Sequence, residues 1–298
     1  MIRKSVIIAF SAILFAFPAF TQDLLMLDEL ELYQLYSDLD KALEQKDNVY
    51  RLSLAGKDLD SLPPGIFKLN NLQELHLSNN KFQQIPDDLK KLAKLQVLEL
   101  KWNKLQEFPD VLLELGNLKS LDLSDNQLEV FPKEALSIEH LEILKLERNK
   151  ITNLPAAVKQ LQKLRILSLW FNQIEEIPPE IGELRMLEEL NLANNSLTHL
   201  PGKLTQCISL RKLFLWSNQI DSLPSTTGNL VSLEKLELKD NNLQKLPASI
   251  GKLEMLMEAN FANNALDSLP PETGNLIFLM TTSPKSPPKW EIWKALKS

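Results

Sequence analysis

The side chains best suited to catalysis are few in this sequence and lie far apart. His76, His140 and His199 are the only histidines, and Cys207 is the only cysteine. A histidine base or a thiol nucleophile needs a partner group within hydrogen-bond reach. The sequence contains no glycine-rich nucleotide loop, no Gly-x-Ser-x-Gly elbow and no cluster of metal ligands. We therefore predict that the chain is not an enzyme and that it uses no metal and no cofactor.

Side chains suited to recognition are concentrated in the middle of the chain. Aromatic residues and arginine dominate the binding energy of protein interfaces, and large aromatic side chains are costly to leave in water without a use. The candidates of this kind are Trp102, Arg148, Trp170, Phe171, Phe214 and Trp216. Which of them share a surface depends on the repeat that carries them.

That repeat is 23 residues long and follows the pattern LxxLxLxxNxLxxLPxxIxxLxx. Ten copies run without insertion or deletion from Val49 to Phe278, and a fixed period of this length is typical of a solenoid. The copies start at Val49, Leu72, Leu95, Leu118, Leu141, Leu164, Leu187, Leu210, Leu233 and Leu256. We expect an α/β solenoid in which each copy adds one short strand to a parallel sheet.

Two positions of the repeat are nearly constant. Position 9 is asparagine in all copies but the first, where Lys57 takes its place, and position 15 is proline in all ten. A buried amide can bond main-chain groups of its own turn and of the next one, so the asparagines should form a ladder. Proline suits the first position of a short helical turn, which we place on the outer side of the solenoid.

Positions 3, 5, 7 and 8 should point from the sheet into open space and carry any specificity. Trp170 and Trp216 occupy position 7 two copies apart, with Ala193 between them. Strands lie about 4.8 Å apart, so the two indole rings should stand roughly 10 Å apart and form a slot for one flat or aliphatic group. Alternatively, the rings pack on their neighbours and only stiffen the surface. The predicted partner-binding set is Trp102, Arg148, Trp170, Phe171, Asn191, Ala193, Asn194, Phe214 and Trp216.

The single cysteine and the net charge narrow the range of possible functions further. Cys207 occupies position 21, where the other copies carry leucine or isoleucine, so we predict a buried apolar side chain.

The formal net charge is −6. Without Arg3 and Lys4 it becomes 31 − 39 = −8. An acidic chain is a poor ligand for nucleic acid or anionic lipid.

The two ends depart from the repeat. Residues 1–21 combine Arg3 and Lys4 with a short apolar run and resemble an export signal, the alternatives being a membrane anchor or a buried cap helix. Residues 22–48 are predicted to form a helical N-terminal cap. We expect helix from Asp23 to Gln45, with a second short helix that begins near Ser37. The alternative is a dimerising helix. Residues 279–298 hold a degenerate repeat and a C-terminal cap helix, or alternatively a free aromatic tail, with Trp290, Trp293 and Leu296 on one side.

These copies resemble the leucine-rich-repeat family, and their Leu-Pro-x-x-Ile-x-x-Leu half is similar to the 23-residue class of Ras-suppressor and scribble-type proteins. With the export signal, the chain resembles exported bacterial members. The resemblance implies a horseshoe whose concave parallel sheet binds a protein or peptide. A glycan-binding surface adhesin is the alternative. We expect a monomer that is exported to the periplasm, the cell surface or the medium. With a single cysteine, the sequence departs from the disulfide-rich caps of animal members, and we expect no catalytic domain like that of bacterial effector ligases.

Overall fold

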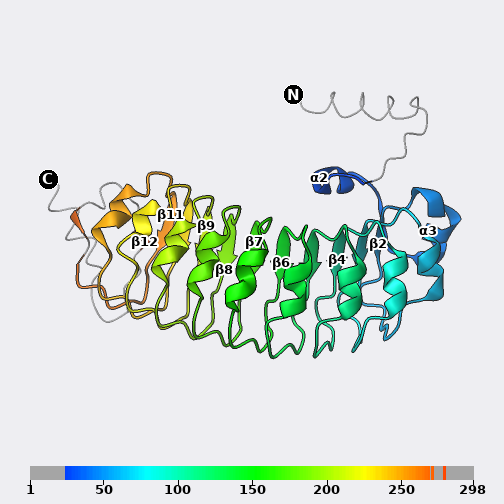
Figure 1. The fold of residues 1–298 in the computed structure, drawn as a ribbon, viewed down its shortest axis with the longest axis horizontal. Helices are drawn as coiled ribbons and strands as arrows, with labels where there is room; N and C mark the ends of the chain where they lie inside the picture. The colour runs from blue at the N-terminus through cyan, green and yellow to red at the C-terminus, as the bar shows by residue number, and fades with distance from the viewer. Residues whose placement is uncertain (1–23, 269, 272–277, 280–298) are drawn as a thin grey trace, which may run out of the picture.

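The fold is a single curved solenoid with one parallel sheet. A computed structural model describes residues 24–268, 270–271 and 278–279 of the 298-residue chain (Figure 1). Twelve strands lie in sequence order from β1 to β12 in one sheet. Their bounds are β1 Leu35–Tyr36, β2 Arg51–Ser53, β3 Glu74–His76, β4 Val97–Glu99, β5 Ser120–Asp122, β6 Ile143–Lys145, β7 Ile166–Ser168, β8 Glu189–Asn191, β9 Lys212–Phe214, β10 Lys235–Glu237, β11 Glu258–Asn260 and β12 Phe278–Leu279.

Each predicted copy supplies one three-residue strand, at positions 3 to 5 of the repeat. Position 4 pairs with position 4 of the neighbouring strand throughout, as in Leu121↔Leu144 and Leu144↔Leu167. These leucines are fully buried and form the inner layer of the core. Because the register never slips, each position of the repeat forms a straight row along the solenoid.

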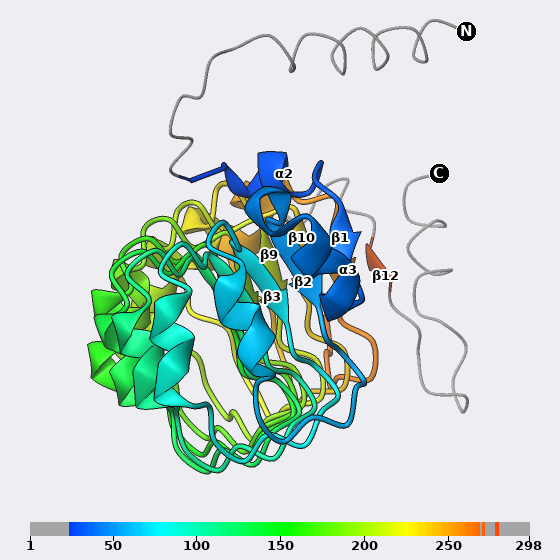
Figure 2. The ribbon, with the colours of Figure 1, turned by 90° about the vertical axis from the view of Figure 1, so that its right-hand side faces the viewer.

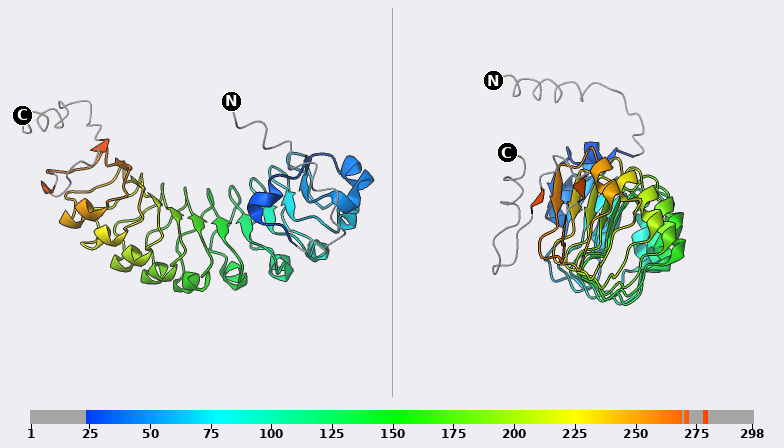
Figure 3. Two further views of the ribbon diagram at one scale, coloured as in Figure 1. Left: turned by 90° about the horizontal axis from the view of Figure 1, so that it is seen from above. Right: turned by 90° about the vertical axis from the view of Figure 1, so that its left-hand side faces the viewer.

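The opposite side of each copy is a short 3-10 helix. These helices are η2 Pro64–Lys68, η3 Asp87–Lys91, η4 Asp110–Glu114, η5 Lys133–Ser137, η6 Ala156–Gln160, η7 Pro179–Glu183, η8 Gly202–Gln206, η9 Thr227–Asn229 and η10 Ala248–Lys252. The view from above shows the strands on the inner edge of an arc and the helices on its outer edge (Figure 3). Strands only about 4.8 Å apart on one side and bulkier helical turns on the other bend the stack, which confirms the predicted horseshoe with a concave sheet (Figure 3).

The proline of position 15 stands one place before the helix in eight of these nine turns, as the residue that caps it and not as its first helical residue. Its fixed φ, near −70° at Pro86 and Pro155, ends the extended segment and points the chain into the turn. Proline therefore sets the turn, as expected, but the helix begins one residue later than predicted.

The predicted asparagine ladder is present in the core. Asn126 shows its pattern: its Nδ2 donates to the carbonyl oxygens of Leu100 and Leu123, each at 3.0 Å, and its Oδ1 accepts from the Leu105 backbone N–H at 3.0 Å. Leu100 and Leu105 belong to the preceding copy, so each amide ties its own turn to the one before it and not to the one after it. The side chain thus satisfies main-chain groups that the turn would otherwise leave buried and unpaired.

The N-terminal segment is less helical than predicted. It contains α2 Leu27–Leu30, β1, α3 Leu39–Glu44 and η1 Lys46–Asn48. The helix expected from Asp23 to Gln45 was wrong, because the chain turns at residues 31–34 and then adds β1 to the sheet beside β2. The cap of α3 is Asp38, whose side chain accepts from the Lys41 N–H at 3.1 Å, and not Ser37.

Residues 24–33, which we call the N-terminal strap, lie against the first copies (Figures 1 and 2). Leu25 and Leu30 are buried. The Leu25 N–H donates to Gln73 Oε1 at 2.9 Å, and its carbonyl accepts from Gln96 Nε2 at 2.9 Å. Two fully buried glutamines thus hold a main chain that precedes them by 48 and 71 residues. The export signal and the C-terminal cap helix lie outside the described residues.

Candidate functional site

Three aromatic rings meet on the concave surface between β7 and β9. The rings of Trp170 and Trp216 have centroids 6.2 Å apart with planes tilted by 46°, and Phe171 meets Trp170 edge-on at 6.1 Å. We call Arg148, Trp170, Phe171 and Trp216 the aromatic cluster. The predicted 10 Å slot between the two tryptophans was wrong, because the side chains lean toward each other across the intervening copy. Ala193, the expected floor, is fully buried beneath them.

Arg148 joins this cluster through its guanidinium plane. Its Cζ lies 4.6 Å from the Trp170 ring centroid and 4.9 Å from that of Phe171, which is the geometry of a cation–π contact. Its Nε is 3.9 Å from Asp125 Oδ1, a distance too long for a hydrogen bond. The rings therefore hold the charged group while its N–H edge stays without a hydrogen bond to the described residues.

The other predicted site residues lie around this centre. Asn191 and Phe214 are half-buried at position 5, and Asn194 is half-buried at position 8. Asn191 Oδ1 accepts from the Ala193 N–H at 3.2 Å, and Lys235 Nζ lies 5.9 Å from the Phe214 ring centroid. Trp102 stands apart, two copies before Arg148 in the row of position 8. It is 55% exposed and contacts the Lys101 ammonium at 5.3 Å.

Position 8 has a property that the sequence analysis missed. Its φ is positive in every copy, a conformation that favours glycine, asparagine and aspartate and disfavours large side chains. The residues are Gly56, Asn79, Trp102, Asp125, Arg148, Phe171, Asn194, Ser217, Asp240 and Asn263. Seven of them are small or short polar residues, and that composition was the available signal. The three large ones, Trp102, Arg148 and Phe171, all belong to the predicted site.

A second polar group on the concave surface lies near the N-terminal end. Arg51 Nε donates to Glu74 Oε2 at 2.7 Å, and its Nη1 donates to the carbonyl of Tyr33 in the strap. His76 Nε2 lies 2.6 Å from Glu74 Oε1. Burial raises the pKa of Glu74, but the hydrogen bonds from His76 and Arg51 outweigh it and hold this pKa below its usual value. The group fixes the strap, and sequence spacing alone did not reveal it.

Comparison with known proteins identifies the repeats. A family model described as leucine rich repeat matches residues 47–105, 116–174 and 162–220, and a second model of that description matches residues 232–253. Together they cover more than half of the chain. The chain belongs to the leucine-rich-repeat family. A search of curated protein sequences found no match.

Solved leucine-rich-repeat structures are similar over most of the chain. A leucine-rich-repeat protein of Leptospira interrogans is 26% identical with a TM-score of 0.58, over 89% of this chain and 98% of that one. The ectodomain of the Arabidopsis thaliana receptor kinase GASSHO1/SCHENGEN3, solved with Casparian strip integrity factor 2, is 34% identical with a TM-score of 0.63 over 79% of this chain and 29% of that one. The plant peptide hormone receptor RGFR1, solved with RGF2, is 26% identical with a TM-score of 0.62, over 78% and 43%.

The reactive side chains of this leucine-rich-repeat chain are not assembled into a reaction centre among the described residues. Cys207 is buried and donates to the Ile181 carbonyl at 3.2 Å, and burial raises its thiol pKa to about 12, so it is not a nucleophile at neutral pH. His140 contacts Lys163 and His199 contacts Thr198, both on exposed surface. In the described part of the chain we find no group of metal-ligating side chains, and no helix with the length and apolar content to span a membrane.

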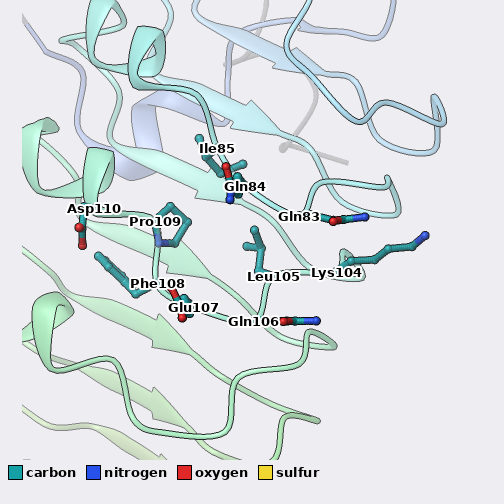
Figure 4. A pocket seen from close by; sticks show the side chains of 10 residues that line it. All are labelled: Gln83, Gln84, Ile85, Lys104, Leu105, Gln106, Glu107, Phe108, Pro109 and Asp110. Carbon is teal, nitrogen blue, oxygen red and sulfur yellow. The ribbon is translucent and has the colours of Figure 1, made fainter.

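One pocket of the repeats lies away from the concave surface. It has a volume of about 410 Å³ and lies where residues 83–85 and 104–110 lead from strand to outer helix in two neighbouring copies (Figure 4). Gln83, Lys104 and Gln106 point outward at its edge (Figure 4). It contains no member of the predicted partner-binding set, and no ion pair fixes a charged side chain in its polar lining. The aromatic cluster is therefore the better candidate site.

Proposed function

We propose that this leucine-rich-repeat protein is a non-catalytic scaffold that recognises a protein or peptide through its concave surface, with the aromatic cluster at the centre of the site. The observation that carries the proposal is the contact of Trp170 and Phe171 with the Arg148 guanidinium, which makes no hydrogen bond to the described residues, beside the ring of Trp216. Phe171 is 49% exposed in this cluster. Rings and arginine gathered on an open surface are the composition of a binding hot spot.

The structural relatives support the same class of function. The two plant receptors were solved with the protein or peptide factors named above. The concave charges of our chain include both signs, as in the ion pairs Lys212–Glu189 and Lys101–Asp125. A mixed surface of this kind suits a protein partner better than a polyanion.

The remaining features complete the proposal. We infer that the repeats belong to the 23-residue Ras-suppressor and scribble-like class, and that the chain is an exported bacterial member that works as a monomer. Residues 1–21 then act as the export signal. Residues 22–48 and 279–298 act as the caps of the ten repeats. The final location would be the periplasm, the cell surface or the medium.

Affinity capture with residues 22–298 tests the proposal. Cell lysate and surface extract are passed over the unmodified chain and over a Trp170→Ala/Trp216→Ala variant. The matched control is Met186→Ala/Met255→Ala, which removes two exposed apolar side chains outside the concave surface. We expect one protein to be retained by the unmodified chain and the control but lost from the tryptophan variant, while all three chains unfold at similar urea concentrations.

Two outcomes would contradict this proposal. Equal retention by the tryptophan variant would remove the aromatic cluster from the binding site. Retention of a glycan that a simple sugar releases would replace the protein partner by the surface adhesin function. The contact between Trp170 and Trp216 weakens the case for a sugar, because the open slot predicted between the two rings is closed.

A further inference from the structure

Arg148 differs from every other arginine that the structure describes. Arg51, Arg165 and Arg211 donate hydrogen bonds to glutamate side chains, and Arg185 donates to the main chain of Gln206. Arg148 donates none to the described residues, although its nearest acid, Asp125, is 3.9 Å away. A guanidinium carries five N–H donors in a planar fork, and this fork is left free on the concave surface.

The rings explain why this fork is held in place. The guanidinium Cζ lies 4.6 Å from the Trp170 ring centroid and 4.9 Å from that of Phe171, and these two contacts hold the group beside the rings, at 3.9 Å from Asp125. Its side chain is 45% exposed, so the free N–H edge is open to a partner. A planar arginine that is already ordered loses little side-chain entropy when it binds a planar anion in a bidentate way.

The acids beside Arg148 leave its N–H donors without a hydrogen bond. Asp125 lies 3.6 Å from Lys101 Nζ and 3.9 Å from Arg148 Nε, so one carboxylate faces two cations. The nearby Glu147 accepts a hydrogen bond from the Ser168 hydroxyl at 2.7 Å. The two acids balance the charge of Lys101 and Arg148, but neither of them accepts a hydrogen bond from the Arg148 guanidinium.

The backbone of the same row adds an independent observation. Arg148, Phe171 and Trp102 hold φ values of 49°, 58° and 56°, where a large side chain costs roughly 1–2 kcal/mol relative to glycine. The other copies place glycine, asparagine, aspartate or serine there. Only in this stretch does the row keep large side chains despite the unfavourable backbone, and strain of this kind is concentrated at functional sites.

We propose that the partner presents an aspartate or glutamate side chain to Arg148, on an extended segment that also places an apolar side chain against Trp102. Arg148 and Trp102 are two strand spacings apart, roughly 10 Å. An extended chain in the polyproline II conformation rises about 3.1 Å per residue and returns to the same side every third residue, so the acidic and apolar residues are about three positions apart. This inference rests on the proposed function and specifies the chemistry of its partner.

A library of random linear 12-residue peptides, displayed on phage and selected against the full chain, tests this. Enriched peptides are synthesised as amides and bound to the unmodified chain, to Arg148→Gln and Arg148→Lys, and to Arg185→Gln as a matched control outside the concave surface. We expect an enriched Asp or Glu with an apolar residue about three positions away. Changing that acid to its amide should weaken binding roughly 10-fold or more, as expected for a charged hydrogen-bonded pair.

The cross-comparison separates this pair from general weakening. In Arg148→Gln the acid and amide peptides should bind within about two-fold of each other, since the coupled partner is gone. Arg148→Lys should keep part of the acid preference, and Arg185→Gln should keep all of it. A preference that persists in Arg148→Gln would overturn the assignment to Arg148.

Three other results would also overturn the inference, each in a distinguishable way. Peptides that lose binding in Trp170→Ala/Trp216→Ala but carry no acidic residue would leave the proposed function standing and remove the carboxylate. Binding that requires a free C-terminus instead of the amide would assign the fork to a chain end. Selection of no peptide that depends on the aromatic cluster would count against the proposed function and this inference together.

Discussion

Positions 8 and 9 of the repeat are neighbours in the chain but are used in opposite ways. Position 9 is asparagine in nine copies, and at Asn126 its amide makes hydrogen bonds to the turn and to the preceding copy. Position 8 holds residues that range from glycine to tryptophan, its backbone is left-handed in every copy, and at Arg148 its side chain makes no hydrogen bond to the described residues. The first position builds the solenoid, and the second is available for recognition.

The difference follows from the direction of the two side chains. Position 9 points inward, where an unpaired main-chain group is expensive and only one side chain of suitable size and polarity fits. Position 8 points outward, where water can satisfy any polar group and a large side chain costs only its backbone conformation. Changes at the two positions should therefore affect stability in opposite directions, and the predictions below test that.

The largest effect should come from Asn126→Ala. The change leaves the Leu105 N–H buried without its partner, while the Leu100 and Leu123 carbonyls each lose one hydrogen bond and keep those from Asn103 and Asn149. At about 1–3 kcal/mol for the unsatisfied N–H and about 1 kcal/mol for each of the two other hydrogen bonds, we expect about 3 kcal/mol less free energy of unfolding in urea. Asn242→Ala removes an exposed amide whose one contact is 3.5 Å long and should cost under about 0.5 kcal/mol. Equal losses in the two variants would refute the ladder's role.

A smaller loss is expected where the same device holds the N-terminal strap. Gln96→Ala removes the amide that donates to the Leu25 carbonyl and to Gln73 Oε1. We expect a cost of about 1–2 kcal/mol and faster amide hydrogen exchange confined to residues 24–33. The matched change, Gln106→Ala, removes an exposed glutamine in the same copy and should leave exchange in the strap unaltered. Uniformly faster exchange along the whole solenoid would contradict a local role.

Much of this architecture was predictable because the repeat is local. A leucine at position 4, an asparagine at position 9 and a proline at position 15 each act within one turn, and the same pattern recurs along the ten copies. The strap was not predictable in the same way. Gln73 and Gln96 are polar residues at a position where other copies carry Lys119 or Glu142, and nothing in their spacing indicates that a main chain 48 or 71 residues earlier will bind them.

The site was predicted as a set of residues but not as a shape. Strand spacing correctly placed Trp170 and Trp216 on one row, yet spacing describes backbones, and the rings close the gap by leaning together over Ala193. The contact of Arg148 with both rings depends on side-chain direction, which the repeat pattern does not encode. The left-handed backbone of position 8 could have been inferred from the Gly, Asn and Asp that most copies place there.

Acid should loosen the N-terminal end before the middle of the solenoid. The folded pKa of Glu74 lies below its usual value of 4.5, so its contribution to stability is complete above that value and is lost as pH falls through the folded pKa. We expect the free energy of unfolding to fall more steeply below pH 4.5 in the unmodified chain than in Glu74→Gln. Glu176→Gln, at an exposed residue, should retain the steep fall. A Glu74→Gln curve parallel to that of the unmodified chain would contradict the network.

The smallest effect, and the one of opposite sign, is expected at position 8. Trp102→Asn replaces a large left-handed residue by one that tolerates the conformation, which regains roughly 1–2 kcal/mol, and gives up an exposed contact with Lys101 worth about 0.5–1 kcal/mol. We expect a net gain of about 0.5–1 kcal/mol in urea unfolding. Trp102→Ala loses the same contact but keeps a Cβ in the unfavourable conformation, so it should be no more stable than the unmodified chain. A gain in stability in both variants would assign the effect to the loss of the exposed indole and not to the backbone. A gain for Trp102→Asn alone, accompanied by weaker partner binding, would mean that this row sacrifices stability for recognition.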